Sequence, residues 1–197
     1  MVKENQRDRT KTQLSTTLKT LLRQKPLSQI RVRELTEQCG IRRQSFYYHF
    51  TDVYDLFAWS IRQERADLLA RQRACLTWQQ VLEDLLAHTA ADRAYYQALL
   101  ESRGRQGLRD TFQDAVEQML RQTMVYYEVR GGAVRDDAAE AVRLQSWSAI
   151  LLALLEGWIC GELEQPPELL IAHLEQLVED SAVGMAWQNL SRGENGE

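Results

Sequence analysis

Leucines recur at three- and four-residue spacing near the start of the chain. Leu14, Leu18, Leu21 and Leu22 fall on one side of an amphipathic helix, which this spacing predicts from about Arg7 to Arg23. Pro26 ends the helix, because proline disfavours helical geometry at the residue before it and has no amide hydrogen to continue the ladder.

A short amphipathic pattern follows at residues 32–39, with Val32, Leu35 and Cys39 on its inner side. Gly40 suits the left-handed position that ends a helix. A second short helix is predicted at residues 42–49. Helix, glycine-containing turn and short helix together form a helix-turn-helix pattern.

The rest of the chain continues in helical patterns. A long helix after Phe50, capped by Thr51 or Asp52, carries the stripe Val53, Leu56, Phe57, Ser60 and Ile61. Thr77 and Gln80 match a capping box, Asp92 is a candidate cap, and Gly104 and Gly107 interrupt the pattern. Further helices are predicted at about 108–129, 136–161 and 167–190.

These patterns predict an all-α protein of about nine helices. We expect a three-helix head with the helix-turn-helix at residues 1–56, a larger helical body at 57–190, and a disordered polar tail at 191–197. The 197 residues, 44% hydrophobic and 26% charged, fit an ordinary globular protein.

Charge divides the chain into two parts. Residues 1–62 hold 12 Lys and Arg against 6 Asp and Glu, whereas residues 63–197 hold 12 against 22. A basic head before an acidic body favours a polyanion partner for the head; chance clustering of solvated charges is the alternative. No secretory signal or membrane span is evident, and three widely spaced cysteines favour reduced thiols in a cytoplasmic protein.

The second helix of the motif carries side chains suited to the major groove of DNA. Arg42, Arg43, Gln44 and Ser45 begin it, where guanidinium and amide groups can pair with base edges. Tyr47, Tyr48 and His49 have polar tips suited to phosphate oxygens, although packing is an alternative for both tyrosines. Phe46 and Phe50 lie four residues apart and are expected to anchor the helix in the core.

Residues 8–56 resemble the DNA-binding head of the TetR family of bacterial regulators. Gly40, Ser45, Phe46, Tyr47, Tyr48, His49 and Phe50 match its signature, and Leu56 occupies its usual apolar position. The strings "RRQSFYYHFTDVYDLFAW" and "LLEGWICGELEQPPELL" also resemble the subgroup that includes the dihydroxyacetone kinase regulator.

Two positions depart from the family pattern. Arg31 stands where many members have a hydroxyl residue that caps the first helix of the motif and touches a phosphate; arginine can reach a phosphate but cannot cap. Val53 replaces a common lysine. Arg31 and Arg33 complete the predicted DNA-binding set.

The last two predicted helices carry more apolar residues than one stripe needs, which favours a homodimer through a four-helix bundle. The predicted interface consists of Ile150, Leu151, Leu154, Trp158, Leu170, Leu174, Leu177 and Met185. The alternative is that these faces pack only within one chain.

The resemblance implies a sequence-specific regulator that binds an inverted-repeat operator, and we expect a repressor released by a small molecule. Activation, control by a protein partner, and a helical adaptor or enzyme with an incidental motif are the alternatives. Candidate effector contacts, which core packing could equally explain, are Trp78, His88, Tyr95, Tyr96, Arg121, Tyr126 and Trp147. No catalytic, metal or cofactor motif is present, so no enzyme activity is predicted.

Overall fold

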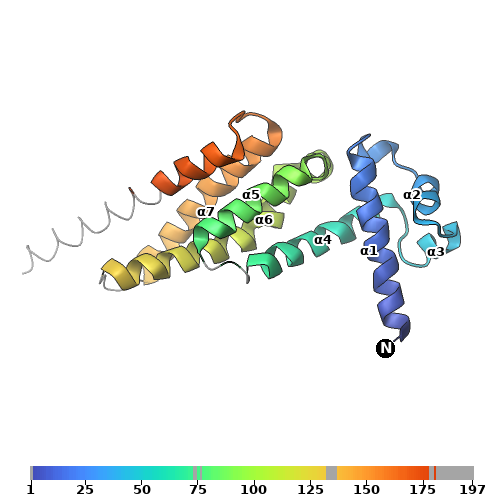
Figure 1. Cartoon of the computed structure of the whole chain (residues 1–197), viewed down its shortest axis with the longest axis horizontal. Coiled ribbons are helices and arrows are strands. Elements are labelled where there is room, and N and C mark those ends of the chain that lie inside the picture. Colours follow the sequence, from blue (N-terminus) through green and yellow to red (C-terminus); the bar gives the residue numbers. More distant parts are fainter. Residues whose placement is uncertain (1, 73–74, 76, 132–136, 178–179, 181–197) are drawn as a thin grey trace, which may run out of the picture. The chain divides into compact units, whose positions relative to one another are not determined.

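Helices are the regular elements in the part of the chain that the structure describes (Figure 1). The computed structural model describes residues 2–72, 75, 77–131, 137–177 and 180, with side chains outside residues 2–7 and 124–139. The all-α expectation is confirmed. The predicted tail at 191–197 lies outside the described residues.

The chain divides into two compact units. The first comprises Met1–Asp67 and Asp92–Thr111, and the second comprises Leu68–Ala91 and Phe112–Glu197. This division differs from the boundary at residue 56 expected from the sequence. The reason is that the buried stripe of the long helix continues through Ile61 and is joined by Tyr95 and Tyr96 from a later helix.

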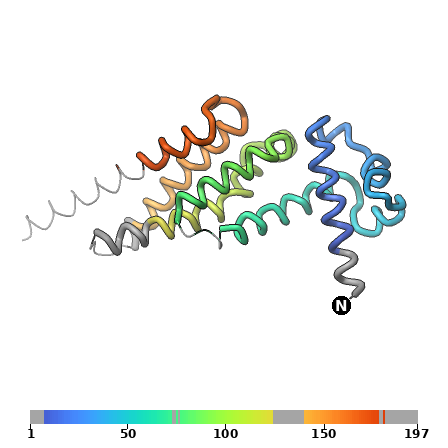
Figure 2. Tube along the Cα trace, in the orientation of Figure 1, coloured from blue at the N-terminus to red at the C-terminus, as the bar shows by residue number. Residues whose placement is uncertain are grey.

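The first unit contains α1 (Val2–Leu22), η1 (Leu27–Gln29), α2 (Val32–Cys39), α3 (Arg43–Tyr47) and the beginning of α4 (Val53–Gln72). Helix α1 packs on α2, and α2 packs on α3, as the backbone trace shows (Figure 2). The bounds of α2 are those predicted from the sequence. The core of the first unit is formed by Leu14, Leu18, Leu35, Phe46, Leu56, Phe57, Tyr95, Tyr96 and Leu99.

Polar side chains set the start of α4. The Asp52 carboxylate accepts the Asp55 amide at 2.8 Å, so Asp52 is the cap. Asp55 in turn accepts the Thr51 amide at 3.0 Å. Val53, which replaces the lysine common in the family, is buried instead.

Helix α6 (Arg93–Gly131) is interrupted at Gly104, where φ is 66° and ψ is −174°. These angles lie outside the helical region and are open in practice only to glycine. The predicted interruption is therefore real, and α6 consists of two helical segments, before and after Gly104.

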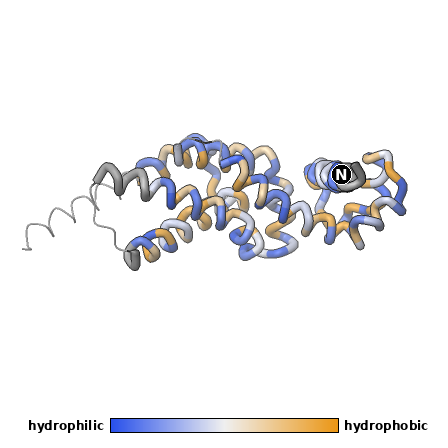
Figure 3. The backbone as a smooth tube through the Cα atoms, turned by 90° about the horizontal axis from the view of Figure 1, so that it is seen from below, coloured by the Kyte–Doolittle hydropathy of each residue, from blue (hydrophilic) through white to orange (hydrophobic). Residues whose placement is uncertain are grey.

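The second unit contains α5 (Trp78–Ala91), α7 (Asp137–Cys160) and a helical stretch at 167–177, together with the later part of α6. The Gln80 amide donates to the Thr77 hydroxyl at 3.3 Å, as the capping box predicts. Hydrophobic and hydrophilic positions alternate along these helices (Figure 3). No described helix is long and apolar enough to cross a membrane.

Candidate nucleic-acid interface

The turn between α2 and α3 is built on Gly40, whose φ of 65° and ψ of 28° are left-handed. The Ile41 amide donates to the Thr36 carbonyl at 3.0 Å, which closes the helix end in a Schellman arrangement. The chain is extended at Arg42 and then enters α3. Backbone bonds continue to Phe50, whose amide donates to the Phe46 carbonyl at 3.0 Å.

The cap residue and the first residues of α3 present polar groups to solvent. Arg42, Arg43 and Gln44 are exposed, and Ser45 is half-buried. Guanidinium and amide groups at the start of a short exposed helix can form paired hydrogen bonds with base edges. The structure therefore brings together the four residues predicted to read sequence.

The aromatic residues of α3 and of the three positions after it divide between core and surface. Phe46 and Phe50 are buried with ring centroids 5.9 Å apart, and Phe50 also contacts the Trp59 ring at 5.9 Å. The side chains of Tyr47 and Tyr48 are 57% and 63% exposed. His49 is half-buried, and its ring lies 5.1 Å from that of Tyr48. The phenylalanines hold the helix, and both tyrosine hydroxyls can reach a polyanion.

The start of α2 shows a feature that sequence reasoning missed. Arg31 makes no capping bond with its side chain, as expected, but Glu34 accepts the Arg31 amide at 2.9 Å. A hydrogen bond from Lys25 and the one from the Arg31 amide lower the pKa of Glu34. The signal was present, because an acid three residues after the cap position is half of a capping box.

Ion pairs within the head reduce the positive charge available to DNA. Arg33 donates to Glu37 at 2.6 Å, and Lys25 pairs with Glu34. Arg31 and Arg33, which belong to the predicted DNA-binding set, remain exposed. Arg33 would share its guanidinium between Glu37 and a phosphate.

Two further basic residues bind acids inside the first unit. Lys19 donates to Glu64 at 2.6 Å and to Asp92 at 3.1 Å. Arg23 donates to Asp92 at 2.6 Å. The positive charge that the head presents to solvent is therefore smaller than its number of Lys and Arg residues suggests. Lys19 has a structural role.

The residues predicted as effector contacts do not form one site. Tyr95 and Tyr96 are buried in the first unit, where the Tyr96 hydroxyl donates to Glu64 at 2.6 Å. Burial and the nearby Glu64 carboxylate raise the pKa of Tyr96. The other candidates differ in burial. Trp78 is buried, His88 and Trp147 are half-buried, and Arg121 is exposed. The Tyr126 side chain lies outside the described residues.

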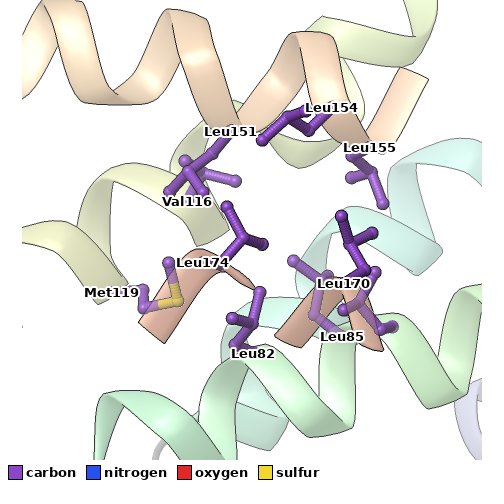
Figure 4. Close-up of a pocket in the computed structure, with 10 residues that line it drawn as sticks. Leu82, Leu85, Val116, Met119, Leu151, Leu154, Leu155, Leu170 and Leu174 are labelled. Carbon is purple, nitrogen blue, oxygen red and sulfur yellow. The ribbon is translucent and has the colours of Figure 1, made fainter. Parts of the chain in front are cut away.

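The second unit encloses a cavity with about 20 Å³ of free space (Figure 4). Its lining is entirely apolar: Leu82, Leu85, Leu86, Val116, Met119, Leu151, Leu154, Leu155, Leu170 and Leu174. None of the six predicted effector residues with described side chains lines it. The space is little more than that of one water molecule, and its walls offer water no partner.

Most residues predicted at the dimer interface are placed inside the chain's own second unit. Leu151, Trp158, Leu170 and Leu174 are buried, and Leu154 is half-buried. Leu151, Leu154 and Trp158 fill this unit from the apolar side of α7. Ile150 and Leu177 are exposed, and Met185 lies outside the described residues.

Comparisons with known proteins agree with this architecture. A family model described as a transcriptional regulator C-terminal region, of the TetR type, matches residues 76–180, which is more than half of the chain. The solved structure of the dihydroxyacetone kinase operon activator DhaS aligns with a TM-score of 0.73 at 21% identity, covering 88% of this chain and 96% of that one. No curated protein sequence matches the chain.

The two matches concern complementary properties. The family model covers residues 76–180, which include most of the second unit, and the structural likeness covers 88% of the chain. At 21% identity the solved structure supports the fold alone, whereas the family model shows the family. The resemblance found in the sequence is confirmed, and the chain belongs to the TetR family of transcriptional regulators.

Proposed function

We propose that this transcriptional regulator binds an inverted-repeat DNA operator as a homodimer and represses the genes beside it. The observation that carries the proposal is the structure of α3. Two guanidinium groups and an amide are exposed at its start, on Arg42 at the cap position and on Arg43 and Gln44 in the first turn. Phe46 and Phe50 are buried and anchor the helix in the core. A rigid helix with exposed base-reading groups is what the major groove selects.

The contacts divide by chemistry. Arg42, Arg43 and Gln44 read base edges, because bidentate pairing distinguishes guanine and adenine. Ser45 assists from its half-buried place. Tyr47, Tyr48, His49, Arg31 and Arg33 hold phosphates, which fixes the register but carries little sequence information.

Two helices supply the dimer surface. Val142 and Ile150 of α7 are 64% and 43% exposed, and Leu177 is 45% exposed. Val142, Ser146, Ala149, Ile150 and Ala153 are exposed residues of one helix face, at three- and four-residue spacing. The small alanines allow a partner helix to approach Ile150 closely. A two-fold axis through this face would place two copies of α3 about 34–36 Å apart when bound to DNA.

Repression requires the fewest features beyond those described, since occupation of an operator by itself blocks a promoter. Release by a small molecule requires a pocket. The cavity in the second unit, with about 20 Å³, would have to open, because ligand pockets typically hold roughly 300–1,000 Å³. An effector at this place would be apolar.

The small cavity supports a second candidate, which is control by a protein partner. In that case the α5, α7 and 167–177 helices would keep their packing and the signal would arrive at the surface. The solved structure with this fold is named an operon activator. A reporter fused to the promoter of the regulator's own gene distinguishes repression from activation. Deletion of a repressor raises reporter expression, whereas deletion of an activator lowers it.

Binding to the DNA upstream of its own gene tests the proposal. Saturable binding should survive excess unrelated duplex and weaken steeply with salt, because each phosphate contact adds roughly 0.9 to the log–log slope. Affinity that is equal for upstream and scrambled duplexes at every salt concentration would refute sequence-specific recognition there.

A further inference from the structure

Polar bonds fasten α1 at three levels along its length. Near its middle, Gln13 Nε2 donates to the Cys39 carbonyl at 3.0 Å, at the residue before the Gly40 turn. The Ser15 and Ser60 hydroxyls are 2.8 Å apart and join α1 to α4. Toward its end, Lys19 bonds to Glu64 and Asp92.

The bonds at the end of α1 form a polar cluster, made of Lys19, Arg23, Glu64, Asp92 and Tyr96. Glu64 is 3% exposed and accepts from both Lys19 and the Tyr96 hydroxyl, each at 2.6 Å. Two cations face two carboxylates, so the cluster is neutral. Lys19 also lies 4.7 Å from the centre of the Tyr95 ring. Lys19, Glu64 and Tyr96 are largely enclosed and bonded to one another, whereas the Arg23 side chain is 58% exposed.

One rigid element joins this cluster to the helix-turn-helix. Gln13 and Lys19 lie six residues apart on α1, which is about 9 Å along a helix. Between them Leu14 and Leu18 are fully buried, so α1 is pressed against the core. A shift of α1 at the cluster would therefore move the Gln13 bond that holds the end of α2, and with it the turn leading to α3.

The cluster also defines which part of α6 belongs to the head. Asp92 immediately precedes α6 and Tyr96 lies in its first turn, and residues 92–111 pack in the first unit with residues 1–67. Gly104 then breaks the helix, so the segment from Arg93 to Arg103 is a helical piece of its own. Residues 92–111, although far from the helix-turn-helix in sequence, thus complete the unit that contains it.

We propose that Lys19, Glu64, Asp92 and Tyr96 are positioning residues for DNA recognition. They lock the first segment of α6 to α1 and thereby hold the Gly40 turn and α3 in the pose that reads bases. Recognition requires placement to within about 0.5 Å, so loosening this lock should damage specific binding before it damages folding. The inference rests on the proposed DNA-binding function.

The test compares four full-length proteins: wild type, Asp92→Asn, Tyr96→Phe and Arg71→Met. Arg71 pairs with Asp84 at 2.9 Å in the second unit, so Arg71→Met removes an ion pair outside the cluster. The probes are a duplex carrying the inverted repeat selected by wild type from random sequence and a scrambled duplex. Binding is measured well below the melting temperature of each folded protein.

We expect Asp92→Asn and Tyr96→Phe to weaken operator binding by about tenfold, the size of coupling through a packed network. Binding to the scrambled duplex and the salt slope should stay unchanged, because no phosphate contact is lost. Arg71→Met should bind as wild type does. Operator binding in wild type should also slow hydrogen exchange at residues 93–103.

Two outcomes would overturn the inference while leaving the proposed function intact: folded Tyr96→Phe that binds the operator as wild type does, or Arg71→Met with an equal loss. A reduced salt slope in Asp92→Asn would also overturn it, since it would show a lost phosphate contact. If wild type selects no sequence at all, the proposed function itself fails. If Asp92→Asn does not fold, Tyr96→Phe and the exchange measurement decide.

Discussion

Arg43 and Phe46 stand three residues apart on α3 and have opposite tasks. Phe46 is fully buried and contacts the Phe50 ring, which fixes the backbone of the helix. Arg43 is exposed at the first helical position. Because Phe46 anchors the helix independently of Arg43, truncating Arg43 should leave the fold unchanged and alter only DNA recognition.

We predict that Arg43→Ala costs about 1–3 kcal/mol of operator binding and relaxes base preference at the position it reads. The measurement is a titration against the operator and against single-base variants of it. Tyr47→Phe is the matched variant, since it removes one exposed hydroxyl from the same helix and should weaken all duplexes alike. If Arg43→Ala lowers affinity equally for operator and unrelated DNA, its role as a base reader is wrong.

The shape of one element, α6, depends on a single residue. Gly104 has φ of 66° and ψ of −174°, which side-chain-bearing residues adopt at a cost of about 1–3 kcal/mol. We predict that Gly104→Ala lowers the free energy of unfolding by about this amount. Thermal and urea unfolding followed by circular dichroism measure it.

Gly157 of α7 provides the control. An added Cβ there would meet Leu163 at 3.4 Å, an ordinary contact, and the backbone φ is not positive. Alanine in a helix is favoured over glycine by roughly 1 kcal/mol. Gly157→Ala should therefore hold or raise stability. Equal losses for both variants would mean that packing, and not the Gly104 backbone, sets the cost.

The polar cluster predicts how stability depends on pH. Burial opposes the charge of Lys19, but Glu64 and Asp92 outweigh it and raise the Lys19 pKa above its ordinary 10.5. This contribution is full at neutral pH and is lost as pH rises through the raised value. Burial likewise opposes the charge of Asp92, but Arg23 and Lys19 lower the Asp92 pKa below 3.8. That contribution is lost as pH falls through the lowered value.

We therefore expect the free energy of unfolding to be nearly flat between about pH 5 and 9 and to fall on both sides. Asp92→Asn should lose roughly 1–3 kcal/mol at pH 7, since the cluster is only partly buried, and should show a shallower acid decline. Urea unfolding across the pH range measures both. An acid decline as steep as that of wild type would show that other carboxylates control it.

Elements with strong local signals could be predicted from the sequence. The bounds of α2, the left-handed Gly40 and the break at Gly104 follow from periodicity and backbone chemistry. The cluster could not be predicted, because Lys19, Glu64 and Asp92 are brought together only by tertiary packing. The sequence likewise does not show that Leu151 and Leu170 turn inward while Ile150 and Leu177 stay exposed.

For the whole molecule, the exposed face of α7 predicts association. A charge at Ile150 would have to be buried unpaired against the partner helix, so Ile150→Glu should shift the protein toward monomer. Ala87→Glu adds the same charge at an exposed position of α5 and should leave the dimer intact. Sedimentation at micromolar concentration compares the two variants. A wild-type protein that is already monomeric there and binds its operator tightly would contradict the dimer model.

The most direct measurement is selection of duplexes from random-sequence DNA by the full-length wild-type protein, followed by sequencing of the bound pool. Two α3 helices related by a two-fold axis should enrich an inverted repeat with half-site centres about 10–10.5 base pairs apart, or a multiple of that spacing. Loss of this enrichment in Arg43→Ala would tie the repeat to α3. A wild-type pool with no enriched motif, or with a single asymmetric site, would contradict the account.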